Sequence, residues 1–143
     1  HNCELELVIL RVPLVIGPGA KGNLKSVSRI AKFRVPLPFS GILNKRSVIF
    51  MNSLVDAIFH CATDKRAANK IVMLKDKHDM STTAILRETA KLQGVNLKLF
   101  WVPTFILRTF FILIGRRDLI NKILLSCQVD NSDTERTIGW VAK

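Results

Sequence analysis

Apolar and polar residues follow one another along the chain in blocks that predict alternating strands and helices. The run LELVIL at 5–10 is short, apolar and rich in β-branched residues, and it predicts a buried strand. A stretch rich in proline and glycine, 13–19, predicts a loop after that strand. Over 24–33 the apolar positions recur at helical spacing behind Asn23, a residue suited to an N-cap, so we expect an amphipathic helix there.

The same alternation continues downstream. The apolar runs 47–51 and 70–74 predict two further strands. Between them we expect a helix capped by Ser53. The expected apolar face of that helix consists of Leu54, Ile58, Cys61 and Ala62. A later helix should begin at Ser81 as its cap and end at Gly94.

The last third of the chain repeats the alternation in shorter pieces. We expect a strand over 97–102, a helix beginning at Pro103, a helical segment over 118–126, a short strand over 127–130 and a final helix over 132–137. Strands that alternate with helices in this way predict an α/β fold.

The composition is that of a folded chain with a basic surface. At 143 residues the chain has the length of one compact domain, and 48% apolar with 23% charged residues is typical of a globular protein. A formal charge of +11 attracts nucleic acid, acidic membranes or phosphorylated ligands. The basic residues are scattered among acids, without an aromatic-interleaved stripe, so nucleic acid is not expected as a partner. A solvated basic surface with one anion site is the simpler interpretation.

Several kinds of catalytic and metal site have no signature in the sequence. Cys3, Cys61 and Cys127 are dispersed, and no histidine stands at ligand spacing, so we expect no zinc site and a reducing, cytoplasmic location. The chain has no tyrosine and neither a Gly-x-Ser-x-Gly nor a His-Glu-x-x-His motif. No combination of residues therefore points to an acid, a base or a nucleophile within the chain.

The most apolar segment is 97–115. Pro103 and Arg108 interrupt it, which leaves uncharged runs far shorter than the roughly 20 residues of a membrane span. We expect a strand followed by a buried or partner-covered helix. A helix lying in a membrane interface is the alternative.

Three places along the chain are candidates for ligand binding. Gly17 and Gly19 would let the backbone approach a ligand at the end of the first strand, although from these glycines alone a plain strand-to-helix turn is the favoured interpretation. Lys45 and Arg46, directly before a strand, could hold a diphosphate or only form a solvated charge pair. Phe39, in a proline-rich loop, could stack on a base or fill the core.

Three segments taken together resemble a known family. They are VILRVPLVIGPGAKGN at 8–23, KRSVIFMNSLVDAI at 45–58 and VDNSDTERTIGW at 129–140. In this order they resemble the C-terminal half of NAD-dependent nucleotide-sugar epimerases and dehydratases, the extended short-chain dehydrogenases, in the UDP-glucose 4-epimerase-like branch. The resemblance implies that residues 1–143 are a substrate-binding region, a small α/β subdomain together with the last strands of a Rossmann sheet. Those strands would be 5–10 and 70–74.

The resemblance also implies where the cofactor lies. In relatives the backbone at the positions of Val12 and Pro13 faces the nicotinamide carboxamide of NAD. The glycine-rich loop and the catalytic Tyr-x-x-x-Lys pair of the family would lie upstream of His1, so no catalytic residue is expected within this chain. Leu14 and Ile16 stand where many relatives have asparagine and tyrosine, which leaves the preferred sugar open.

The remaining family positions surround the UDP part of the substrate. The residues implied to bind it are Asn23, Leu24, Phe39, Arg46, Arg116 and Arg117. Asn23 and Leu24 match an Asn-Leu pair on the uridine diphosphate side, and Phe39 lies in the loop that covers the uracil. Arg46 matches an arginine that grips the diphosphate, and either Arg116 or Arg117 would supply a second one.

The function that the resemblance implies is epimerisation of a UDP-sugar at C4 by hydride transfer to and from NAD, in nucleotide-sugar or surface polysaccharide metabolism. A dehydrogenase or 4,6-dehydratase of UDP- or dTDP-sugars, from the same family, is an alternative. A non-enzymatic basic module that binds nucleic acid or membrane is the alternative from another class. We expect the isolated chain to self-associate through exposed strand edges and the parent enzyme to be a homodimer.

Overall fold

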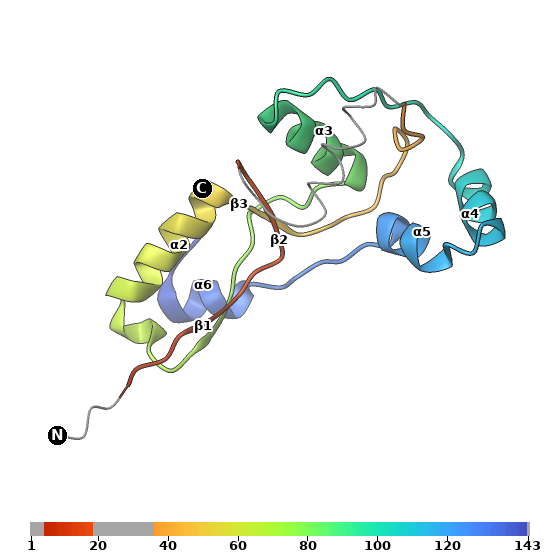
Figure 1. Cartoon of the computed structure of the whole chain (residues 1–143). Helices are drawn as coiled ribbons and strands as arrows, with labels where there is room; N and C mark the ends of the chain where they lie inside the picture. The colour runs from red at the N-terminus through yellow and green to blue at the C-terminus, as the bar shows by residue number, and fades with distance from the viewer. Residues whose placement is uncertain (1–4, 19–35, 143) are drawn as a thin grey trace. The chain divides into compact units, whose positions relative to one another are not determined.

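A computed structural model describes residues 5–18 and 36–142 (Figure 1). They form two compact units, each assembled from separate segments of the chain. The strand unit takes its residues from 1–16, 47–79 and 128–143, and the helical unit from 17–46 and 80–127. The chain passes from one unit to the other and back, and the expectation of one domain stays a prediction. The helix expected over 24–33 lies outside the described residues.

The strand unit contains two pairs of parallel strands. Strand β1 (Ile9–Arg11) pairs with β4 (Ile71–Met73), and β2 (Leu14–Ile16) pairs with β3 (Val48–Phe50). The chain changes its pairing partner from β4 to β3 at Pro13, which has no amide hydrogen and cannot donate a backbone hydrogen bond to a neighbouring strand. The strands predicted over 47–51 and 70–74 are confirmed. Strand β2 was not predicted, since the proline and glycine residues around it indicated a loop.

The first apolar run differs from its prediction. Only Ile9 and Leu10 of the run 5–10 belong to β1, and the segment is largely exposed, with Leu5 at 86%. The expectation of a buried strand is therefore wrong in this chain. An apolar run is buried only where a second layer packs over it, and periodicity alone does not show whether that layer is present.

The core of the strand unit lies between its strands and helix α2 (Met51–Thr63). Its buried members are Ile49, Ala57, Cys61, Ala67, Val72, Leu74, Ile138, Trp140 and Ala142. Two predictions about this helix are wrong. Ser53 lies inside the helix, and the start is held instead by the Phe50 N–H, which donates to Asp76 Oδ2 at 2.8 Å. Ile58, expected on the buried face, is about half exposed.

The predicted helix from Ser81 to Gly94 is confirmed in the helical unit as α3 (Thr82–Leu92). The Ser81 hydroxyl accepts a hydrogen bond from the Ala84 N–H at 3.1 Å, as expected of an N-cap. Gly94 has a φ of +64°, a left-handed conformation that glycine adopts without strain and that ends helices.

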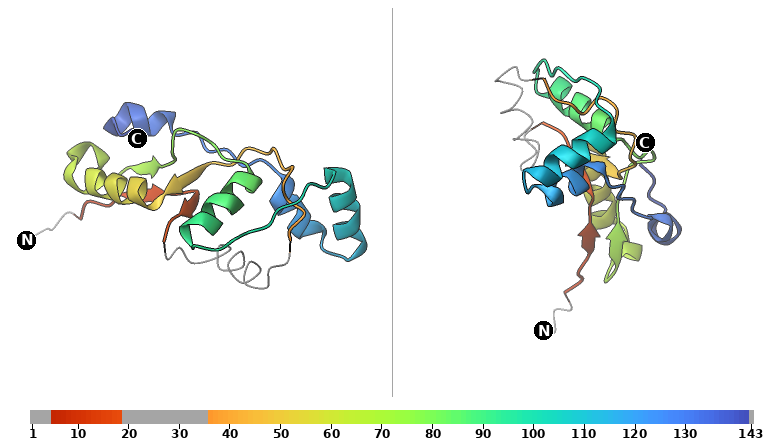
Figure 2. Two further views of the ribbon diagram at one scale, coloured as in Figure 1. Left: turned by 90° about the horizontal axis from the view of Figure 1, so that it is seen from above. Right: turned by 90° about the vertical axis from the view of Figure 1, so that its right-hand side faces the viewer.

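Two further helices of the helical unit, α4 (Thr104–Leu113) and α5 (Arg117–Leu124), lie side by side in Figures 1 and 2. They confirm the helices predicted near 103 and 118. No helix within residues 5–18 and 36–142 is long and apolar enough to cross a membrane.

The strands predicted over 97–102 and 127–130 are wrong. Each segment makes a single bridge, Leu37 to Leu99 and Arg46 to Cys127. Leu37 lies between Pro36 and Pro38, and because neither proline can donate a backbone hydrogen bond, pairing does not extend along the chain.

The strand unit ends with α6 (Ser132–Ile138), which confirms the predicted final helix. The side chain of Thr134 hydrogen-bonds to the backbone of Met73 in β4, as a neighbouring strand would do with its backbone. Its hydroxyl donates to the Met73 carbonyl at 2.8 Å and accepts from the Met73 N–H at 3.0 Å. Gly139 follows the helix with a φ of +67°.

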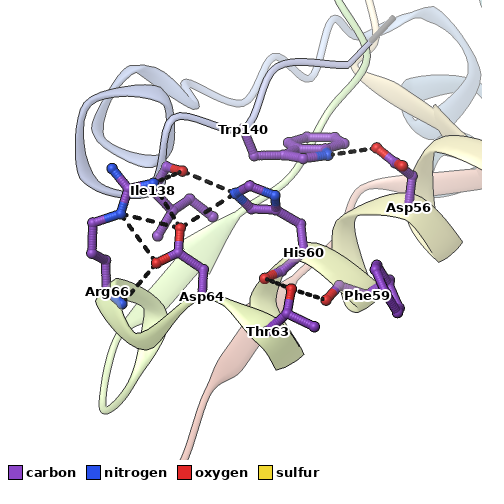
Figure 3. A network of polar contacts seen from close by, with 8 residues as sticks. All are labelled: Asp56, Phe59, His60, Thr63, Asp64, Arg66, Ile138 and Trp140. Atoms are coloured by element: carbon purple, nitrogen blue, oxygen red, sulfur yellow. Dashed lines mark hydrogen bonds and ion pairs between the residues drawn. The ribbon is translucent and has the colours of Figure 1, made fainter.

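Polar contacts attach the end of α6 to the end of α2 (Figure 3). The Ile138 carbonyl accepts a hydrogen bond from Arg66 at 3.1 Å and lies 3.0 Å from His60 Nε2. Trp140 is buried, and its indole N–H donates to Asp56 at 3.1 Å. Hydrogen bonds from Arg66 lower the pKa of Asp64 to about 2. The 129–140 segment therefore holds the strand unit together.

Candidate functional site

Arg46 is the candidate residue with the most defined surroundings. Its backbone exchanges two hydrogen bonds with Met80, at 3.0 and 2.9 Å. Its guanidinium donates from Nη1 to the Lys122 carbonyl at 2.9 Å, near the end of α5. A cation at this position interacts favourably with the negative end of the helix dipole. Arg46 is half-buried, and its hydrogen bond to the Lys122 carbonyl directs the side chain toward α5.

Asn44 fixes the segment that carries Arg46. Its side-chain amide donates to the carbonyls of Ile123 and Leu125, at 3.1 and 2.9 Å, and its Oδ1 accepts from the Thr82 N–H at 2.8 Å. Asn44 thus joins the end of α5 to the first residue of α3. Sequence reasoning missed this residue, because an asparagine before a Lys-Arg pair carries no distinctive signal.

The electrostatics around this segment suit an anion. Lys45 is exposed, Arg46 follows it, and Arg46 is paired to Met80, two residues before α3 begins. The start of α3 carries a partial positive charge near the same backbone segment, and its first N–H, that of Thr82, donates to Asn44 Oδ1. A phosphate or diphosphate group is the kind of ligand that such a combination favours.

Phe39 lies in a loop whose backbone is held from two sides. Its carbonyl accepts a hydrogen bond from the buried Thr83 hydroxyl at 2.6 Å, which ties the loop to α3. Nearby, Gly41 packs so closely against the indole of Trp101 that a Cβ atom would collide with it. Phe39 itself is half-buried. Both of its predicted roles, stacking on a base and filling the core, therefore remain predictions.

Arg116 and Arg117 lie at the opposite end of α5 from the Arg46 contact. Both are exposed, and Arg117 and Lys122 are five positions apart on the helix, about 7.5 Å along the axis. A cation at the start of a helix opposes the dipole, so neither arginine is placed there to stabilise α5. The geometry leaves open which of them would serve as a second diphosphate ligand.

The predicted cofactor residues Val12 and Pro13 belong to the strand unit, where the chain changes partner between β1 and β2. Val12 is exposed and Pro13 is half-buried, so both positions have surface available to a ligand. Gly17 is half-buried directly after β2. Gly19, Asn23 and Leu24 lie outside the described residues.

The sequence is similar to that of a curated protein. The chain is 38% identical over 140 residues to a UDP-glucose 4-epimerase from Vibrio cholerae. The matched region covers 97% of this chain and 43% of that protein. The chain resembles the C-terminal part of a nucleotide-sugar epimerase. This confirms the resemblance drawn from the sequence. The chain spans less than half the length of this relative. No protein-family model matches the chain.

Solved structures of epimerases share the fold of the chain. An epimerase from Methanothermobacter thermautotrophicus aligns with a TM-score of 0.63 at 18% identity, over 98% of this chain and 39% of that one. A UDP-glucuronic acid 4-epimerase from Bacillus cereus, in complex with NAD, aligns with a TM-score of 0.56 at 13% identity, over 99% of this chain and 41% of that one. The predicted fold class, an α/β fold of the extended short-chain dehydrogenase type, is confirmed.

Proposed function

We propose that this epimerase-like chain is the substrate-binding part of an NAD-dependent UDP-sugar 4-epimerase. The observation that carries the proposal is the 38% identity, over 97% of the chain, to a protein named UDP-glucose 4-epimerase. A fold shared with a UDP-glucuronic acid 4-epimerase supports it. The reaction belongs to cytoplasmic nucleotide-sugar metabolism, including the supply of surface polysaccharide.

In this proposal the diphosphate of the UDP-sugar binds beside Arg46. The adjacent Lys45 and the start of α3 support this role, because both add positive charge near the same backbone segment. Phe39 covers the uracil, and Arg116 or Arg117 provides a second positive charge. Asn23 and Leu24 complete the UDP side. Asn44 acts indirectly, because it positions Arg46.

NAD in this proposal lies mainly on the half of the enzyme that precedes the chain. The exposed Val12 and the adjacent Pro13 would face its nicotinamide carboxamide. NAD supplies hydride transfer at C4 of the sugar. The catalytic residues lie in the preceding half, so the chain alone does not catalyse the reaction.

Exposed apolar residues before β1, on β1 and on β4 support the assignment of 5–10 and 70–74 to a larger sheet. Leu5, Leu7, Ile9 and Ile71 are all exposed in this chain. In the whole enzyme a Rossmann sheet would cover this surface. In the isolated chain the same surface favours self-association, and the whole enzyme is proposed to be a homodimer.

Calorimetric titration with UDP tests the site. We expect UDP to bind and Arg46→Ala to weaken binding about tenfold or more, since a charge-assisted hydrogen bond contributes roughly 1.5–3 kcal/mol. Arg87→Ala is the matched control, because Arg87 is an exposed arginine on α3 and its loss changes the net charge equally. Equal weakening by both variants would show that only overall charge matters, and this outcome contradicts the proposed site.

A further inference from the structure

Helix α4 exposes an apolar face that the proposed function does not use. Of its ten residues only Leu107 is buried. Ile106, Phe110 and Leu113 are exposed at spacings of four and three, which places them on one face of the helix, and Phe105 lies beside them. We call these four residues the α4 face. In Figure 1 the helix is drawn in teal next to α5.

The chain around the α4 face is basic and aromatic. No acidic residue occurs from 89 to 117. The basic residues in this stretch are Lys91, Lys98, Arg108, Arg116 and Arg117. Phe100 and Trp101 precede the helix and are exposed, Trp101 at 67%. Apolar exposure thus coincides with positive charge along the whole segment.

Helix α2 provides a contrast within the same chain. It also exposes apolar side chains, Val55, Ile58 and Phe59. However, its residues include Asp56 and neither lysine nor arginine. The combination of exposed apolar side chains with uniformly positive charge therefore distinguishes the segment around α4.

We propose that the α4 face binds the surface of an anionic lipid bilayer, with the helix lying in the interface. The apolar side chains would enter the boundary of the acyl region, while arginine and lysine remain among the phosphate groups. Tryptophan is favoured at that depth because its ring is apolar and its N–H is polar. Charge complementarity selects an anionic leaflet over a second copy of this chain, which carries the same +11 charge.

The intrinsic tryptophans allow a direct test on the unmodified chain. Trp101 is exposed, whereas Trp140 is 4% exposed and gives a constant background. We expect vesicles of phosphatidylcholine with about one third phosphatidylglycerol to shift the emission to the blue, and about 1 M salt to weaken this effect. Absence of a shift with these vesicles, or an equal shift with pure phosphatidylcholine, would overturn the proposal.

Three glutamate substitutions locate the binding surface. Leu113→Glu and Phe105→Glu change side chains that are 79% and 70% exposed, so the fold should persist, as circular dichroism can verify. Each should lower vesicle binding about tenfold or more, because it removes a buried apolar contact and adds a repelled charge. Phe59→Glu, at 69% exposure on α2, should leave binding unchanged.

Two results in the variant series would overturn the proposal. One is an equal loss of vesicle binding in Phe59→Glu and Phe105→Glu, because binding would then follow general apolar exposure. The other is unchanged vesicle binding together with conversion of a dimer to a monomer by Leu113→Glu. Light scattering would detect that conversion, which would assign the α4 face to a second copy of the chain.

Discussion

Replacing Asn44 with alanine removes three hydrogen bonds that join α5 to α3. The bonds to Ile123 and Leu125 and the bond from Thr82 measure 3.1, 2.9 and 2.8 Å. At a net 0.5–1.5 kcal/mol per bond, the loss of unfolding free energy is about 1.5–4.5 kcal/mol. We expect the lower half of that range, because water can replace Asn44 at the exposed Leu125 carbonyl. We therefore predict that Asn44→Ala lowers the free energy of unfolding by about 2 kcal/mol.

Urea unfolding followed by circular dichroism measures this loss. With a typical urea dependence, a change of about 2 kcal/mol lowers the midpoint by roughly 1 M. Asn96→Ala is the control, because Asn96 is exposed and has no side-chain hydrogen bond within the described part of the chain, so its midpoint should stay unchanged. If Asn44→Ala shifts the midpoint no more than Asn96→Ala, Asn44 does not hold the segment that carries Arg46.

Two further predictions concern the strand unit. Hydrogen bonds from Arg66 lower the pKa of Asp64 from 3.8 to about 2. The contact therefore contributes its full stability at pH values above 3.8, and this stability is lost as the pH falls through about 2. Arg66→Ala should return this pKa toward 3.8 in an NMR titration, and an unchanged pKa would refute the assigned cause. Burial raises the pKa of the Cys61 thiol, whereas Cys127 is exposed. In a Cys3→Ser background, iodoacetamide should modify Cys127 in the native state and Cys61 only after unfolding; comparable rates for both would contradict the buried position.

Local signals in the sequence were sufficient to predict both ends of α3. Ser81 and Gly94 mark α3 because a hydroxyl cap and a left-handed glycine act through neighbouring residues only. The start of α2 was misplaced at Ser53, since its N-terminal contact comes from Asp76, 26 residues away along the chain. A contact of that kind is a property of the folded chain and has no local signature.

The candidate site was predictable only in part, for the same reason. The sequence singled out Lys45 and Arg46 from their charge before a strand. It could not predict that the Arg46 guanidinium would bond to α5, or that Asn44 would join α5 to α3. The hydrogen bonds from Arg46 and Asn44 to the end of α5 connect residues 76 to 81 positions apart in the sequence. The Thr-x-x-x-Ile-Gly-Trp part of the last motif, at 134–140, was recognisable by resemblance. Its role in satisfying β4 and closing the core emerged from the structure.

We propose that this chain forms the substrate-binding part of a UDP-sugar 4-epimerase. The most direct test uses the longest natural protein that contains the chain, with NAD and UDP-glucose, and follows the sugar signals by NMR. We expect UDP-galactose to appear and Arg46→Ala to lose much more of the rate than Arg87→Ala. A 4-keto or oxidised sugar as the accumulating product, or no conversion together with no binding of UDP, would contradict it.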